Sequence, residues 1–275
     1  MFIRLIALVL AVAFMWRAAG TPAVIVAAAI APAAFYAVLI ALAARGARAH
    51  VSLLIATFFW GAVFAAWLAT TLNAAVTGPL HPRSFDPVLA VPAIEELAKG
   101  TALVIAMIAA PRALRGVRDC IVGGAMVGLG FAASENVLYL TLAALQGGYP
   151  GLFQAMYLRS LLYGLNHAVF TATTGAALGY ARDAASRPRA AIMALVGWCA
   201  AVVQHLAWNA TAATRIVEIL CDPAAVGEAC RVPPSPWHLY VVAPAIVTLF
   251  VGPGAVVLLA LARRRESMAW ATRCR

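Results

Sequence analysis

Apolar runs of membrane-spanning length fill most of this chain, and they restrict its fold more than any other feature. Of the 275 residues, 64% are hydrophobic and 11% are charged, whereas a typical soluble domain has about 25% charged residues. A run of about 20 apolar residues crosses the hydrocarbon core of a bilayer as a helix. A helix also satisfies its own backbone polar groups in lipid. We therefore expect an all-α, polytopic membrane helix bundle whose surroundings are the lipid bilayer.

Eight segments have the composition expected of membrane spans, and short connections separate most of them. The first is short, but it lacks a convincing cleavage site and is better interpreted as a membrane helix than as a signal peptide. Short connections favour antiparallel neighbours, so we expect one integral membrane domain over residues 1–275. The expected spans are Phe2–Trp16, Ala23–Ala44, Val51–Val76, Val88–Ala110, Cys120–Leu145, Ser160–Ala181, Ala190–Thr214 and His238–Ala262.

The arginines predict the orientation of these spans. Fourteen arginines fall on the side that would hold both termini, and four fall on the opposite side. Because cytoplasmic loops carry the excess of basic residues, both termini are expected to be cytoplasmic. The net charge of +10 is then a topology signal, and no nucleic-acid partner is expected. Cys221 and Cys230 would lie in an outer loop, where they could form a disulfide or remain two free thiols.

Charged and polar side chains interrupt four successive apolar segments, the fourth to the seventh. A charged group at the centre of a membrane helix costs about 2.5–3.5 kcal/mol on insertion scales, so these groups must be paired, hydrated or used. They are Glu95, Glu96 and Lys99, then Glu135 and Asn136, then Asn166 and His167, and finally His205 and Asn209.

These polar groups are expected to lie at one depth. Glu95, Glu135, His167 and His205 each lie seven to ten residues from the outer end of their span, which is roughly 10–15 Å at 1.5 Å per helical residue. An isolated intramembrane polar residue often only joins two helices. Independent packing residues would not be expected to agree in depth, so the set favours a functional site.

The spacing inside each helix places these groups on shared faces. Glu95 and Lys99 are four residues apart, as are Phe131 and Glu135, and also His205 and Asn209. Residues four apart are neighbours on a helix surface, so each helix presents a polar stripe. Two glycine pairs, Gly124/Gly128 and Gly175/Gly179, predict close helix packing.

Such a set of side chains can activate water. Glu95 and Glu96 cannot both ionise cheaply in a medium of low dielectric constant, so one is expected to hold a proton beside a carboxylate base. Lys99 can neutralise one carboxylate. The histidines can bind a metal or stabilise an oxyanion, with Asn209 as a hydrogen-bond donor. Glutamate and histidine together suit zinc with an open water position, and the candidate ligands are His167, His205 and Glu135. The spacing is not the HExxH pattern, so the metal cannot be read from the sequence.

The four motifs together resemble the PrsW family of bacterial intramembrane proteases, which is related to the CAAX prenyl proteases. The resemblance covers about residues 88–214, the expected catalytic core. The matching motifs are EExxK (Glu95, Glu96, Lys99), FxxxEN (Phe131, Glu135, Asn136), the lone His167, and HxxxN (His205, Asn209).

The resemblance implies an endopeptidase of the bacterial plasma membrane that cuts single-span proteins, such as anti-sigma factors, on the extracytoplasmic side. It implies that Glu95 or Glu96 activates water and that His205 and Asn209 stabilise the oxyanion. Glu135 stands where the CAAX enzymes have a histidine, and His167 is a candidate for the missing imidazole. The family is described as metalloproteases, which implies Zn²⁺, while a metal-free glutamate mechanism stays open.

Two other classes of function fit part of the pattern. Glutamate, lysine and histidine at one depth also build proton relays in transporters, although the chain lacks the repeated halves of many transporters. A non-catalytic membrane scaffold of the same fold is the second alternative. All four motifs, however, keep residues that can perform chemistry.

Overall fold

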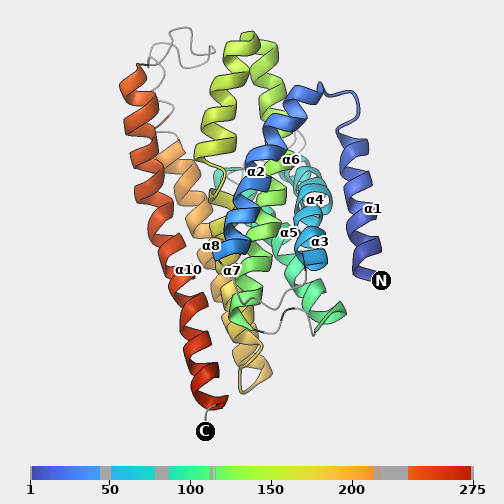
Figure 1. The fold of residues 1–275 in the computed structure, drawn as a ribbon, viewed down its shortest axis with the longest axis vertical. Coiled ribbons are helices and arrows are strands. Elements are labelled where there is room, and N and C mark those ends of the chain that lie inside the picture. The colour runs from blue at the N-terminus through green and yellow to red at the C-terminus, as the bar shows by residue number, and fades with distance from the viewer. Residues whose placement is uncertain are drawn as a thin grey trace.

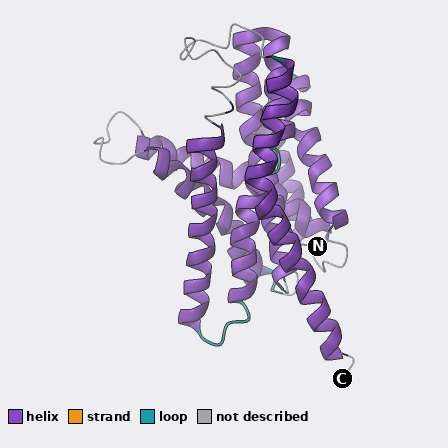
Figure 2. Ribbon diagram, turned by 90° about the vertical axis from the view of Figure 1, so that its left-hand side faces the viewer, coloured by secondary structure: helices purple, strands orange, loops and turns teal. Residues whose placement is uncertain are grey.

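Helices form every regular element in the part of the chain that the computed structural model describes, namely residues 2–43, 51–77, 87–111, 114, 116–213, 216 and 235–273 (Figures 1 and 2). Cys221 and Cys230 lie outside these residues. The α-helices are α1 (Phe2–Arg17), α2 (Ala23–Ala43), α3 (Val51–Trp60), α4 (Ala66–Thr77), α5 (Pro87–Ala109), α6 (Val117–Ala155), α7 (Asn166–Ala181), α8 (Arg187–Ala207) and α10 (Ala243–Arg273). Four π-helical segments join or extend them: Gly61–Ala65, Met156–Leu162, Trp208–Ala213 and His238–Val242.

Five helical stretches are long and apolar enough to cross a membrane: Ala23–Ala43, Val51–Val76, Val117–Ala181, Arg187–Ala212 and His238–Arg263. The helical membrane class is therefore confirmed, whereas the count of eight spans stays a prediction. Three features account for the difference. Helix α1 has only 16 residues, α5 carries three charged residues inside its 23, and the fifth and sixth predicted spans fall within the single stretch Val117–Ala181.

The helices α6 and α7 form the centre of the bundle. In the stretch that contains them, 78% of the most apolar window is buried, against 17–39% in the other four stretches. The predicted close packing at both glycine pairs is confirmed. A Cβ atom at Gly128 would collide with the carbonyl of His167, and one at Gly175 would collide with the carbonyl of Cys120.

A hairpin that the sequence analysis did not predict tops this central pair. Helix α6 continues past Leu145, the predicted end of its span, and the chain reverses at Gly148, whose φ of 60° and ψ of −149° suit glycine almost alone. The chain then returns through Met156–Leu162, and Figure 1 shows the hairpin as the green arch at the top. Helix α2 packs against it through Ile25 and Ala29.

The helical arm that returns from the hairpin ends just before the site. A short turn over residues 163–165 separates the π-helical segment from α7. The hydroxyl of Tyr36, on α2, donates to the carbonyl of Leu161 at 2.6 Å, and the Tyr36 ring lies where a Cβ at Gly164 would stand. This turn places His167 in the first turn of α7.

The remaining helices surround this centre. Helix α5 packs against α4, α6, α7 and α8, while α10 contacts α6 and α7 along the outside of the bundle (Figure 2). In Figure 1 the N-terminus lies in the lower half and the C-terminus at the bottom, away from the Gly148 hairpin. The cytoplasmic location of these ends stays a prediction.

Candidate active site

Four helices bring the predicted polar residues into one buried cluster. Helix α5 contributes Glu95, Glu96 and Lys99, all of which are buried. Glu135 comes from α6, and His205 comes from the last turn of α8. With His167 of α7, these side chains contact one another through the hydrogen bonds and ion pairs given below.

The carboxylate of Glu96 is fully occupied by three neighbours. Its Oε1 accepts a hydrogen bond from Lys99 Nζ at 2.6 Å and lies 3.0 Å from His205 Nδ1. Its Oε2 accepts a hydrogen bond from the hydroxyl of Thr171 at 3.1 Å. Glu96 and Lys99 are both completely shielded from solvent. Glu96 therefore joins α5 to α7 and α8 and holds the His205 ring in place.

Glu95 differs from Glu96 because one of its oxygens is left without a hydrogen bond. Its Oε2 is buried and has no hydrogen-bond partner among the described residues. The same oxygen lies 3.5 Å from Lys99 Nζ and 3.8 Å from His205 Nε2. Buried polar atoms are normally hydrogen-bonded, so this oxygen has free capacity for a water molecule, a substrate or an ion.

His167 lies between a carboxylate and the buried lysine. Its Nε2 is 3.1 Å from Glu135 Oε2, and its Nδ1 is 3.0 Å from Lys99 Nζ. Because the Lys99 ammonium can only donate hydrogen bonds, His167 Nδ1 accepts one from it. Nε2 is then protonated and donates a hydrogen bond to Glu135. Glu135 therefore fixes the orientation and tautomer of this imidazole.

Two residues that sequence reasoning missed complete these contacts. Arg159 Nη2 donates to Glu135 Oε2 at 3.1 Å, and its guanidinium carbon lies 3.5 Å from the centre of the Tyr139 ring. The other is Thr171, which is bonded to Glu96. Thr171 lies four residues after His167, on the same face of α7, and that spacing could have revealed it.

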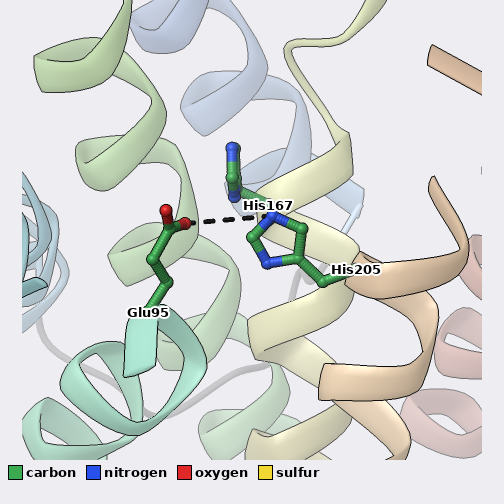
Figure 3. A group of neighbouring side chains, drawn as sticks. All are labelled: Glu95, His167 and His205. Carbon is green, nitrogen blue, oxygen red and sulfur yellow. Dashed lines mark ion pairs between the residues drawn. The ribbon is translucent and has the colours of Figure 1, made fainter. Parts of the chain in front are cut away.

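Three of the residues are placed to hold a metal ion. Glu95, His167 and His205 each offer one ligand atom, and these atoms lie within 4.8 Å of one another. Figure 3 shows the Glu95 carboxylate pointing toward the His205 ring, with His167 beside it. The predicted ligand set named Glu135 instead of Glu95. In the structure Glu135 is engaged by Arg159 and by Nε2 of His167, so Glu95 is the carboxylate better placed for a metal.

The residues around this trio also fit a metal. Histidine ligands usually donate their second nitrogen to a carboxylate or carbonyl. Here His205 faces Glu96 with Nδ1, and His167 faces Glu135 with Nε2. One nitrogen of each ring and one oxygen of Glu95 thus remain as candidate metal ligands. A metal bound to His167 Nδ1 would replace its contact with Lys99.

Other predicted residues lie around the cluster or away from it. The Phe131 ring is buried, and its centre lies 4.1 Å from Lys99 Nζ, a cation–π contact. Asn136 is buried in α6. Asn209 is exposed, whereas His205 is buried. The chain becomes π-helical at Trp208, so Asn209 lies in the segment that extends α8. The role of Asn209 beside His205 stays a prediction.

A cavity of about 640 Å³ reaches the cluster from one side. Glu95 and Glu135 line it, together with residues of α1, α4 and α6. A carboxylate with a free oxygen, two oriented imidazoles and an access route are the features of a site that could activate water for hydrolysis.

Comparison with known proteins agrees with this arrangement. No curated protein and no solved structure matched the chain. The family model described as PrsW family intramembrane metalloprotease matches residues 49–248, a range that holds the whole cluster and about three quarters of the 275 residues. The resemblance noted in the four motifs is confirmed, and the chain belongs to the PrsW family of intramembrane proteases.

Proposed function

We propose that this protein is an endopeptidase that cuts a single-span membrane protein near its outer membrane border, with Glu95 activating the attacking water. The observation that carries the proposal is the buried Oε2 of Glu95, which faces His205 and has no hydrogen-bond partner among the described residues. Glu96 is occupied by Lys99, His205 and Thr171. It is therefore a positioning residue rather than the base.

The reaction is hydrolysis of a peptide bond. Glu95 takes a proton from water as the water oxygen bonds to the carbonyl carbon, and a tetrahedral intermediate forms. The carbon–nitrogen bond then breaks, and Glu95 returns the proton to the departing amine. Lys99, held by Glu96, keeps a positive charge beside the negative charge that develops.

Zinc is the metal that this donor set suits best. Two imidazoles and a carboxylate with room for water form a common catalytic zinc set, and Glu95, His167 and His205 would hold it. Bound zinc would supply a Lewis acid that polarises the carbonyl and makes bound water more acidic. With zinc bound, Glu95 would serve as a ligand and the metal would make the attacking water more acidic. Without zinc, Glu95 is the carboxylate that takes the proton from the attacking water.

The substrate we propose is a single-span protein of the bacterial plasma membrane, such as an anti-sigma factor. The arginine distribution favours a cytoplasmic location for both termini. The Gly148 hairpin and the upper part of α6 would then lie toward the outer surface, and the cluster would lie below it. Nothing in this scheme requires a nucleic-acid partner.

The test is cleavage of single-span reporter proteins by the wild type, Glu95→Gln and Glu96→Gln at equal membrane levels. We expect Glu95→Gln to lower cleavage by at least about 100-fold, the scale of a lost general base, with an unchanged unfolding midpoint in detergent. Glu96→Gln should lower the midpoint as well, because a buried lysine loses its closest partner. Cleavage that survives in Glu95→Gln would exclude Glu95 as the base.

Metal dependence is tested on the same purified protein. We expect stoichiometric zinc in the wild type and its loss in His205→Ala, whereas Cys199→Ala, at an exposed thiol, should keep it. Cleavage that continues at the wild-type rate in protein shown to contain no zinc would leave the metal-free mechanism.

A further inference from the structure

We propose that the cavity beside Glu95 is the binding groove for the substrate, and that it takes one unwound, extended segment of a membrane-embedded polypeptide from the lipid between α1 and α6. This inference rests on the proposed peptidase function and adds the route, the conformation and the contact surface of the substrate. The groove is lined by the end of α1 and the turn that follows it, from Phe14 to Thr21, by one face of α4 from Ala66 to Asn73, and by residues of α5 and α6.

The position of the groove connects the site to the outer half of the bundle. Its lining on α6 runs from Phe131, which contacts Lys99, to Thr141 near the hairpin. Ten helical residues span about 15 Å. An extended chain covers that distance with about four or five residues at 3.3–3.6 Å each. The groove is therefore long enough to hold the residues on one side of a scissile bond that lies at Glu95.

The chemistry of the lining fits an extended backbone. An unwound segment in the membrane must find partners for its N–H and C=O groups, because each unsatisfied group costs several kcal/mol in hydrocarbon. The groove offers Thr70, Ser134 and Thr141 as well as Arg17. The hydroxyls of Thr70 and Thr141 donate to Ala66 and Val137 of their own helices, which leaves their oxygens as acceptors for substrate N–H groups.

The groove is open on its side. Leu138 lines it and is 58% exposed, and Arg17 at the end of α1 is exposed as well. Helix α1 packs against α3 and the segment Gly61–Ala65, and residues at its end line the groove together with residues of α6. A segment could enter sideways from the lipid without crossing the packed α6–α7 centre.

Two adjacent threonines give a matched test of this groove. Thr70 and Thr71 are both exposed, and both donate a hydroxyl hydrogen bond to the carbonyl four residues earlier, at 2.7 and 2.9 Å. The cavity lining includes Thr70 and not Thr71. We expect Thr70→Phe to block cleavage of the single-span reporter and Thr71→Phe to leave it at the wild-type rate.

Photo-crosslinking reads binding without relying on cleavage. A photo-reactive phenylalanine is placed at Leu138 in the groove or at Leu195 on α8, since both positions are 58% exposed. We expect the full-length reporter to crosslink at Leu138 and not at Leu195. A Leu138 product that contains phospholipid and no reporter would overturn the proposal in favour of a lipid site.

The outcomes separate this inference from the proposed function. If the wild type cleaves the reporter but both threonine variants cleave equally and both leucine positions crosslink equally, the groove is wrong and the peptidase stands. If the reporter crosslinks at Leu138 but is never cut, the groove stands and the proposed chemistry falls. If the reporter is not cleaved and does not crosslink selectively at Leu138, both the groove and the peptidase function are overturned.

Discussion

Lys99 has no exposed surface, and it lies within 3.5 Å of two carboxylates and within 3.0 Å of an imidazole nitrogen. We expect Lys99→Met to leave these carboxylates buried without a counter-charge and to destabilise the protein by about 3–5 kcal/mol, the usual result of breaking a buried pair. The measurement is the thermal unfolding midpoint in detergent, with Arg187→Met at the exposed start of α8 as the control.

A second substitution makes this prediction stricter. Adding Glu96→Gln to Lys99→Met removes the closest buried carboxylate as well, so the double variant should regain part of the lost stability. The buried ion pair is not a stabilising element of the site if the effects of the two substitutions on the unfolding midpoint simply add. The same conclusion follows if Lys99→Met has the same midpoint as the Arg187→Met control.

At this scale the sequence predicted which residue types meet but not how their atoms are shared. Intramembrane charges at one depth indicated Glu95, Glu96, His167 and His205. The sequence could not distinguish the two adjacent glutamates. Glu96 differs from Glu95 in its hydrogen bonds to α7 and α8, which no sequence pattern reveals. Arg159 was missed because it stood near the expected end of a span, where a charge needs no partner.

Contact between backbones, rather than between side chains, sets the position of α7 against α6. At Gly128 an added Cβ would collide with the carbonyl of His167. We expect Gly128→Ala to force the helices apart, to cost about 1–3 kcal/mol as overpacking does, and to lower cleavage because His167 moves. Unfolding midpoint and reporter cleavage measure the two effects.

The control for this substitution is Gly252→Ala in α10, where a Cβ would meet only Thr248 at 3.8 Å. Alanine favours helix over glycine by up to about 1 kcal/mol, so this variant should be neutral or slightly stabilised. A Gly128→Ala protein that melts and cleaves like Gly252→Ala would show that the close packing is not needed.

Elements were predicted well where hydropathy alone decides them and poorly where the chain bends. The glycine pairs predicted the α6–α7 contact. The reversal at Gly148 was missed because its unusual φ and ψ have no signal beyond one of two adjacent glycines. The π-helical segment Trp208–Ala213 likewise has no signal in the spacing of the polar residues.

For the whole molecule, the arginine distribution predicts cytoplasmic termini. We expect green fluorescent protein fused after Arg275 to fluoresce. Alkaline phosphatase should be inactive at that position, because it needs the oxidising outer compartment for its disulfides. The pattern should reverse for fusions in the loop that holds Cys221 and Cys230. An active phosphatase at the C-terminus would invert the topology and place the Gly148 hairpin in the cytoplasm.

The hydrogen bonds and ion pairs of α5 also bear on how the protein inserts into the membrane during synthesis. The Glu96 carboxylate contacts His205, which is 109 residues later in the chain, so α5 leaves the ribosome long before α8 exists. Only the pairing of Lys99 with Glu96 and Glu95 is available within α5 itself. That internal pair lowers the charge that α5 carries into the bilayer. We therefore expect Lys99 to ease the insertion of α5 first and to contact His167 only after α7 has been made.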